Sequence, residues 1–184
     1  RLITGNKIFV ERLEGIGVVT PEEAKAYGLN GPNLRGSGIE FDLRRNDPYS
    51  VYPELEFVVP VGQAFAGHLG DCYDRSMVRI LEMSESVKIV RQCLEMIPEG
   101  DLMAKVPRVL KLKAGERYTR TESARGEMGI YIVSNGGKTP YRVRVRTSSY
   151  SALSIFEKLS RGLMIADLVA VIGSFDIVAP EIDR

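Results

Sequence analysis

The chain has 184 residues, of which 44% are hydrophobic and 27% charged, and its net charge is +1. These values are typical of a globular domain, so they exclude intrinsic disorder and predict one domain, with at most an appendage. The balance of charges also argues against a strongly basic nucleic-acid binder. The most apolar tract, residues 163–179, contains Asp167 and Asp176, and it is therefore not a membrane-spanning helix.

Cysteine and histidine are scarce, and this limits the metal chemistry of the chain. It has two cysteines, Cys72 and Cys93, and one histidine, His68. If the segment between the cysteines is helical, their Cα atoms lie about 31 Å apart, whereas a disulfide requires a separation below about 7 Å. Three such residues cannot build a four-ligand zinc site or a cysteine-ligated iron–sulfur cluster. We therefore expect structural thiols, no disulfide and no metal site.

Residues 1–68 are predicted to be rich in loops, with one short helix. Thr20 can cap this helix, Pro21 suits its first position, and Glu23 completes a capping box. The pattern predicts a helix that begins at this point and ends near Tyr27.

Glycine and short apolar runs define the other predictions in this part of the chain. Residues 7–19 are predicted to form turns and short extended pieces, and residues 55–61 a short strand. Residues 31–38 are predicted to form a glycine-rich loop. This loop has neither the Lys-Ser/Thr ending of a P-loop nor the spacing of a dinucleotide fingerprint, so a phosphate cradle is a poor interpretation.

The strongest periodic signal predicts a long core helix within residues 69–100. Apolar residues recur at 3–4 spacing over residues 71–97, and Pro98 and Gly100 end the pattern. This apolar stripe is expected to pack against other helices, as in a bundle. Its members are Ile80, Met83, Val87, Val90, Leu94 and Ile97.

Residues 116–147 are predicted to form a β-hairpin region, with strands over residues 118–122, 129–134 and 141–147. In the last strand arginine alternates with valine, so one face is apolar and the other carries three guanidinium groups. Two interpretations are open, a surface that binds an anion or a partner and a solvated sheet face. The three residues are Arg142, Arg144 and Arg146.

Residues 150–184 are predicted to contain helices over residues 151–159 and 163–174, the second deeply buried because it is apolar almost all round. The predicted fold class is α+β: a long core helix, buried C-terminal helices and a small antiparallel hairpin or sheet. An acidic tail follows the last helix. A carboxylate in apolar surroundings must be paired or its pKa rises, so Asp176 is either a helix-end structural group or a functional acid.

Several segments, in this order and spacing, carry a specific resemblance: residues 1–4, 34–38, 42–44, 70–75, 78–79, 82–83, 121–127, 140–142 and 173–178. Together they resemble the C-terminal part of the quinone-site subunit of NADH-quinone oxidoreductase (respiratory complex I). That family is similar to the large subunits of nickel–iron hydrogenases, so the resemblance implies the C-terminal part of a hydrogenase-large-subunit-like fold. Val178 and Glu181 stand where those hydrogenases have metal-binding cysteines. Neither is a thiolate, which implies a metal pocket reused for a quinone.

The resemblance also implies roles for individual residues. Asp176 is expected to be a proton-linked group in the quinone pocket, and the residues expected to line that pocket are Phe175, Ile177 and Val178. Four residues are expected to face the partner subunit that holds the terminal [4Fe–4S] cluster: Arg35, Gly36, Ser37 and Gly38. The C-terminal anchor is expected to be Asp183 and Arg184.

By the same resemblance, quinone is the substrate and the chain itself binds no cofactor, while NADH and FMN belong to other subunits. The chain begins at Arg1 rather than Met, and we expect a piece of a larger subunit that holds one wall of the site and is inactive alone. We expect it on the cytoplasmic side of the cell membrane, as a peripheral subunit on the membrane arm, with other subunits and no nucleic acid as partners.

Three alternatives stay open. The first is an archaeal oxidoreductase that takes electrons from a reduced deazaflavin or ferredoxin and reduces a quinone or methanophenazine. The second is a membrane-bound hydrogenase. The third is a non-catalytic assembly or nucleic-acid-binding module that uses Arg142, Arg144 and Arg146.

Overall fold

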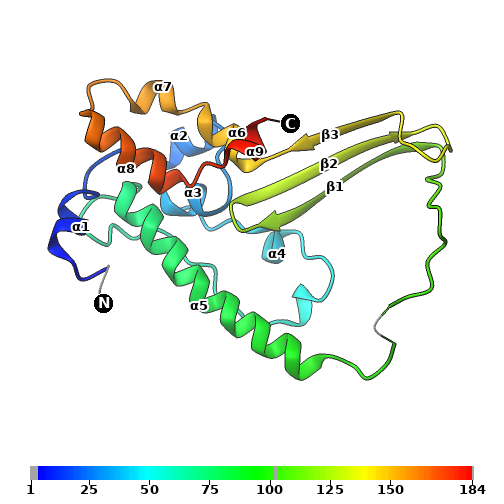
Figure 1. Cartoon of the computed structure of the whole chain (residues 1–184). Helices are drawn as coiled ribbons and strands as arrows, with labels where there is room; N and C mark the ends of the chain where they lie inside the picture. The colour runs from blue at the N-terminus through cyan, green and yellow to red at the C-terminus, as the bar shows by residue number, and fades with distance from the viewer. Residues whose placement is uncertain (1–3, 102, 184) are drawn as a thin grey trace.

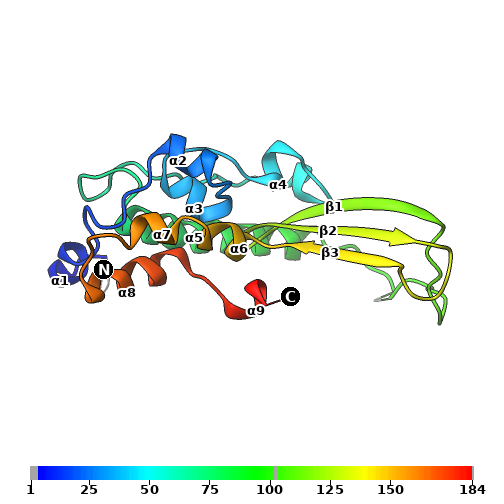
Figure 2. The same ribbon diagram turned by 90° about the horizontal axis from the view of Figure 1, so that it is seen from above.

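A computed structural model describes residues 4–101 and 103–183. Most helices gather around one end of the long helix α5 (Cys72–Met96), and a three-stranded antiparallel sheet extends away from them (Figure 1). Seen from above, the molecule is elongated, with the helices at one end and the sheet at the other (Figure 2). The predicted α+β class is confirmed. Within the described residues, no helix combines the length and the apolar character needed to cross a membrane.

The main hydrophobic core joins segments from both ends of the chain. It includes Val19, Leu34, Cys72, Ile155 and Phe175, all buried. These residues come from the N-terminal segment, the first turn of α5 and the C-terminal region. The core therefore brings the C-terminal tail beside residues that precede it by more than a hundred positions.

Of the first two helices, the sequence predicted the second but not the first. Residues 7–19, predicted to be turns and extended pieces, begin with helix α1 (Lys7–Glu11), because the side chain of Asn6 caps its start. Helix α2 (Pro21–Ala26) begins as predicted. The Glu23 amide donates to Thr20 Oγ1 over 3.2 Å, and the Thr20 amide donates to the Glu23 carboxylate over 3.0 Å.

The predicted glycine-rich loop at residues 31–38 is wrong, because its first six residues form helix α3 (Gly31–Gly36). The glycines serve close packing here. A Cβ on Gly36 would lie 2.6 Å from Arg75 Cγ, so glycine lets α3 approach α5. Gly31 has φ +59°, and a Cβ on it would lie 2.3 Å from Gly126 Cα. Helix α4 (Leu43–Asn46) follows, capped by the Asp42 side chain.

The predicted strand at residues 55–61 is also wrong. After a short 3₁₀ helix, η1 (Tyr52–Glu54), the chain is extended but pairs with no strand of the described part. Side chains of α5 take the place of a partner strand: Gln92 exchanges two hydrogen bonds with the backbone of Glu56, of 2.8 and 2.7 Å. The Val58 amide donates to the Glu85 carboxylate over 3.0 Å.

The long helix is confirmed as α5, with Asp71 as its cap. The prediction that its apolar stripe packs against other helices is wrong for the described chain. Leu94 is 67% exposed and Met83 is 61% exposed. The helix buries a different side, because Ile89 and Cys93 pack against the extended segment around Phe57.

The sheet consists of β1 (Gly115–Ser123), β2 (Gly126–Ser134) and β3 (Arg142–Arg146), in the order β1-β2-β3. Both pairs are antiparallel, as the hairpin signals predicted. Arg144 lies opposite Tyr131, and Arg142 and Arg146 share its face of the sheet.

The C-terminal region is more broken and more exposed than predicted. Residues 151–159 belong to two helices, α6 (Ser148–Leu153) and α7 (Phe156–Leu159). Helix α8 (Ile165–Phe175) is not deeply buried, since Ile165 is 84% exposed. Only its last turns enter the core, and the short helix α9 (Ala179–Ile182) follows.

Candidate functional site

Asp176 lies at a sharp backbone turn that ends α8. Its φ and ψ are 53° and 48°, in the left-handed region, and its amide donates to the Gly173 carbonyl over 3.2 Å. This conformation is uncommon for a residue with a Cβ, although Asp tolerates it better than most. The turn separates the buried Phe175 from a carboxylate that is partly exposed.

Arg125, in the turn between β1 and β2, contacts both the backbone and the side chain of Asp176. Its Nε donates to the Asp176 carbonyl over 3.2 Å and lies 3.2 Å from the carboxylate oxygen Oδ2. Both side chains are partly exposed, and such a pair contributes about 1 kcal/mol or less to stability. The contact serves chiefly to set the position of the carboxylate.

The tail beyond Asp176 is anchored by Glu181. The Thr147 hydroxyl donates to the Glu181 carbonyl over 2.6 Å, and the Ser149 hydroxyl donates to its carboxylate. Asp183, which we expected to anchor the tail, has an exposed side chain, and Arg184 lies outside the described residues. Sequence reasoning missed the anchoring role of Glu181 because its partners lie more than thirty residues earlier.

A cavity of about 630 Å³ opens beside Asp176. It lies between α3, α4, α5, the end of β1 and the end of α8. Half of the residues that line it are charged, and Met83 and Tyr52 are among those that add apolar surface. The charged residues that line it are Arg35, Arg44, Arg79, Glu82, Glu122 and Asp176.

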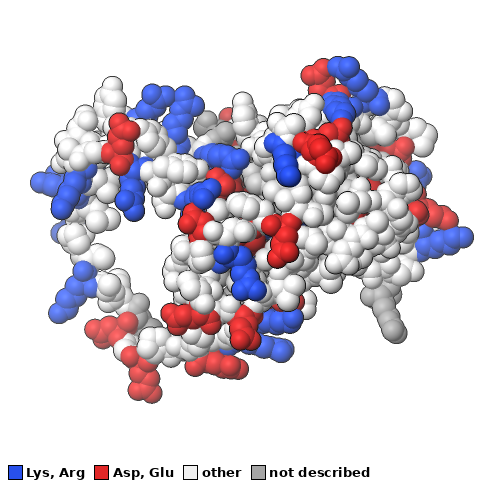
Figure 3. All heavy atoms as spheres, turned by 180° about the vertical axis from the view of Figure 1, so that it is seen from behind, with Lys and Arg blue, Asp and Glu red and all other residues white. Residues whose placement is uncertain are grey.

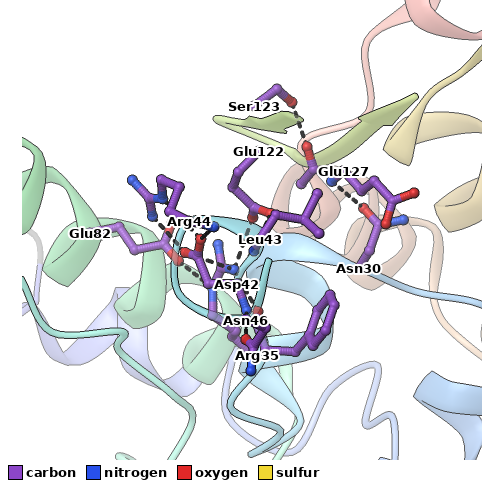
Figure 4. Close-up of polar contacts among 12 residues, drawn as sticks. Asn30, Arg35, Asp42, Leu43, Arg44, Asn46, Glu82, Glu122, Ser123 and Glu127 are labelled. Atoms are coloured by element: carbon purple, nitrogen blue, oxygen red, sulfur yellow. Dashed lines mark hydrogen bonds and ion pairs between the residues drawn. The ribbon is translucent and has the colours of Figure 1, made fainter. Parts of the chain in front are cut away.

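One side of the cavity is a network of buried ions centred on Arg35 (Figure 4). The Arg35 side chain is 1% exposed and contacts three carboxylates. Its Nε donates to Glu82 over 2.7 Å and its Nη1 to Glu122 over 3.0 Å, while Asp42 lies 3.3 Å away. Arg44 completes the network through a two-pronged contact with Asp42, of 2.9 and 2.6 Å.

Burial and ion pairing act differently on the two buried acids. Burial alone would raise the pKa of Asp42, but the hydrogen bond from Arg44 and the charges of Arg35 and Arg44 hold that pKa below its ordinary value. Burial raises the pKa of Glu122, and the charge of Arg35 offsets this only in part. The network therefore holds an acid that is firmly ionised and another that takes up a proton more readily.

The structure assigns different places to the other predicted site residues. Phe175, expected to line the quinone pocket, is 1% exposed, and its ring packs on Phe156 and the guanidinium of Arg75, so it belongs to the core. Ile177 and Val178 are partly exposed, but neither lines the cavity. Only Asp176 of the predicted tail residues does so.

The segment expected to face a partner is turned inward for the most part. Arg35, Gly36 and Ser37 are buried within the chain, and the Ser37 hydroxyl donates to the Val19 carbonyl over 2.9 Å. Gly38 alone of the four is exposed.

Sequence reasoning did not assign a role to Arg79, Glu82 or Glu122. All three lie in segments that carry the family resemblance, residues 78–79, 82–83 and 121–127. Charged residues within those motifs were thus the signal that could have found them. In the part of the chain that the structure describes, no group of three or more His, Cys, Asp or Glu side chains is placed to hold a metal ion.

Comparison with known proteins shows the family to which the chain belongs. A sequence profile described as respiratory-chain NADH dehydrogenase, 49 Kd subunit, matches residues 1–113 and 106–184. Proteins named as the D subunit of NADH-quinone oxidoreductase are similar over the whole chain: 56% identical in Anaeromyxobacter dehalogenans (strain 2CP-C), 56% in Sorangium cellulosum (strain So ce56) and 53% in Chlorobium luteolum (strain DSM 273).

These matches cover 100% of the chain but 48% of each of the three relatives. The chain therefore spans about half the length of the curated relatives it matches. The profile match extends over both the helical body and the sheet, and the identities to the relatives exceed half of the aligned positions. The chain belongs to the family of the 49 kDa subunit of respiratory-chain NADH dehydrogenase.

Proposed function

We propose that this chain is part of the quinone-site subunit of a proton-translocating NADH-quinone oxidoreductase, respiratory complex I, and forms one wall of its quinone-reduction site. The observation that carries the proposal is the place of Asp176, a partly exposed carboxylate at the edge of a charged cavity, in a chain 56% identical to proteins named as the D subunit of that enzyme. NADH and FMN belong to other subunits, and this chain binds no cofactor of its own.

Quinone reduction to quinol takes up two electrons and two protons. The electrons come from the terminal [4Fe–4S] cluster of a partner subunit, and the protons must come through groups that exchange them. Asp176 is the proton-linked group in the proposal, because it is accessible and lines the cavity. Glu82 and Glu122 supply further carboxylates to the same cavity.

The remaining walls of the quinone site belong to parts of the complex outside this chain. A quinone headgroup requires an apolar slot with a few polar groups, whereas half of the residues that line this cavity are charged. Met83 lines it at the start of the exposed α5 stripe, so a covering segment would add apolar surface there. Exposed Gly38 is the part of the 35–38 segment that can lie near the cluster-bearing subunit.

The relation to hydrogenases is part of this proposal. Val178 and Glu181 stand where metal-binding cysteines would stand, and Glu181 holds the tail to Thr147 and Ser149. The Glu181 carboxylate therefore has a structural role, as the acceptor of a hydrogen bond from Ser149. We place the complex on the cytoplasmic side of the cell membrane, with this chain as a peripheral part next to the membrane arm.

Replacement of Asp176 tests the proposal. In the assembled complex, Asp176→Asn should lower quinone-dependent turnover by about 100-fold or more, in the range of general acid catalysis. Oxidation of NADH with an artificial acceptor that bypasses quinone should be unchanged. Asp47→Asn is the matched control, because Asp47 is also a partly exposed aspartate paired with an arginine, Arg120, and lies outside the cavity.

Wild-type quinone turnover in a correctly assembled Asp176→Asn complex would contradict the assigned role. An equal loss with Asp47→Asn would show a general effect of removing a surface acid and would contradict it as well.

A further inference from the structure

We propose that Arg79, together with Asn33, is a positioning residue that holds the Asp176 carboxylate at the cavity. This inference rests on the proposed function of Asp176 and adds the residues that fix the position of its carboxylate. Arg79 belongs to α5 and Asn33 to α3, and both reach the end of α8 from outside that helix.

The contacts of Arg79 are concentrated on the last carbonyls of α8. Its Nη1 donates to the Ser174 carbonyl over 2.6 Å and its Nη2 to the Phe175 carbonyl over 3.1 Å. Helix ends leave such carbonyls without partners in the helix, and their partial negative charge favours a cation there. Arg79 therefore caps α8 at the two residues that immediately precede Asp176.

Asn33 binds the end of α8 together with Arg79. Its Nδ2 donates to the Phe175 carbonyl over 3.2 Å, so this oxygen receives hydrogen bonds from both residues. Arg79 Nη2 also donates to Asn33 Oδ1 over 2.8 Å, which fixes the amide relative to the guanidinium. The carbonyl of Phe175 is part of the peptide bond to Asp176, so its direction sets the direction in which the turn leaves the helix.

The turn requires this support. Asp176 is one of three non-glycine residues with positive φ in the described chain, with Ser50 and Ala64. Such a conformation persists when the surrounding structure over-determines it, and it clusters at functional sites. Arg125 holds the Asp176 carbonyl from the far side, so hydrogen bonds fix the backbone on both sides of the residue.

Arg79 lines the cavity, but four of its five N–H donors are committed to the protein. Each Nη carries two hydrogens. Nη1 donates to the Ser174 and Arg75 carbonyls, and Nη2 to Phe175 and Asn33. Nε is buried and has no partner among the described residues. The geometry thus indicates a role through Asp176 and not direct binding of a substrate.

The charge of Arg79 supports the same role. Burial lowers its pKa to about 10, and the negative charge of Asp176 acts in the opposite direction. Arg79 therefore remains a cation at neutral pH. A lysine would keep this charge, but its side chain ends in a single nitrogen and cannot reproduce the planar fork that spans three carbonyls and the Asn33 amide.

A double-mutant cycle in the assembled complex tests the inference. Arg79→Lys should lower the quinone turnover number by about 10- to 100-fold, since a misplacement of about 1 Å can cost on the order of 100-fold. In an Asp176→Asn background the same change should cause no further loss, because the group that it positions is already gone. Arg161→Lys is the control, as Arg161 is an exposed arginine paired with Glu157.

The amount of assembled complex distinguishes positioning from simple stability. If Arg79→Lys fails to assemble, Asn33→Ala removes two hydrogen bonds, one to the Phe175 carbonyl and one from Arg79, and its effect on turnover should again vanish in the Asp176→Asn background. Equal losses in both backgrounds would overturn the inference. So would normal turnover in both Arg79→Lys and Asn33→Ala while Asp176→Asn is impaired, whereas normal turnover of Asp176→Asn itself would contradict the proposed function instead.

Discussion

At the scale of single residues, one side of the cavity is a network of buried charges that neutralise one another. Arg35 is 1% exposed and contacts Asp42, Glu82 and Glu122. Removal of one partner from such a set leaves an uncompensated charge in a poorly solvated place, which costs about 3–5 kcal/mol. These residues therefore couple the stability of the chain to the ionisation of the cavity.

The pH dependence of this coupling can be tested at Asp42. The pKa of Asp42 is lowered in the folded chain, so its ionised form stabilises the fold above the unfolded pKa of about 3.9. This contribution is lost as the pH falls through the lowered folded pKa. Asp42→Asn should therefore reduce the free energy of unfolding by about 3 kcal/mol at neutral pH, and the difference from wild type should shrink in acid.

Thermal unfolding of the purified full-length subunit, followed by circular dichroism across this pH range, measures the effect. Asp47→Asn is the control, because Asp47 belongs to a partly exposed pair with Arg120 whose loss should cost about 1 kcal/mol or less. A difference between wild type and Asp42→Asn that stays constant into acid would contradict the assignment.

At the scale of elements, α5 serves two surfaces. Its first turns lie in the core, and Gln92 and Glu85 bind the extended segment, while the apolar stripe from Met83 to Ile97 is exposed. An exposed stripe of this length is typical of an interaction surface. Because the chain spans 48% of its relatives, we expect another part of the assembly to cover the stripe.

A charge introduced into the stripe tests this expectation. Val90→Lys, at a position 56% exposed, should leave the melting temperature of the chain nearly unchanged, since little packing is lost. It should reduce the amount of assembled complex several-fold, because a buried unpaired charge is costly. Native gel electrophoresis measures assembly, and Glu95→Lys, on an exposed position outside the stripe, should assemble normally. Normal assembly of Val90→Lys would rule out a covered stripe at this point.

At the scale of the whole molecule, the sheet region departs from the near-neutral balance of the chain. Basic side chains gather around its far end and along the chain that leads to it, as Figure 3 shows from behind. Arg146 binds Glu127 within the sheet over 3.2 Å. The sheet extends beyond the helical body in both ribbon views (Figures 1 and 2).

The open cavity leads to a prediction for the chain by itself. We expect no quinone reductase activity from the isolated polypeptide, because under the proposed function it supplies one wall of the site and the electron carriers belong to other subunits. Quinone-dependent NADH oxidation measured with the isolated chain and with the intact complex decides this. Robust activity of the chain alone would contradict the proposal that the remaining walls lie elsewhere.

The sequence by itself determined the features whose energies are local. The capping box at Thr20, the period of α5 and the hairpin signals of the sheet each depend on residues close together in the chain, and all three are confirmed. The same local reasoning was wrong for residues 31–38 and 55–61. There, a close approach to α5 and hydrogen bonds from its side chains decided the conformation.

Tertiary structure alone decided the composition of the site. Arg35 and Glu122 are 87 positions apart, and Arg79 lies 95 positions from Ser174. No periodicity or capping rule relates residues at such separations, because their pairing depends on which surfaces the core brings together. Asp176 could be singled out from the sequence as a carboxylate in an apolar tail. The arginines that contact its turn, Arg79 and Arg125, and the buried acids near it are identified only from the tertiary structure, in which α3, α5, α8 and the sheet meet around one cavity.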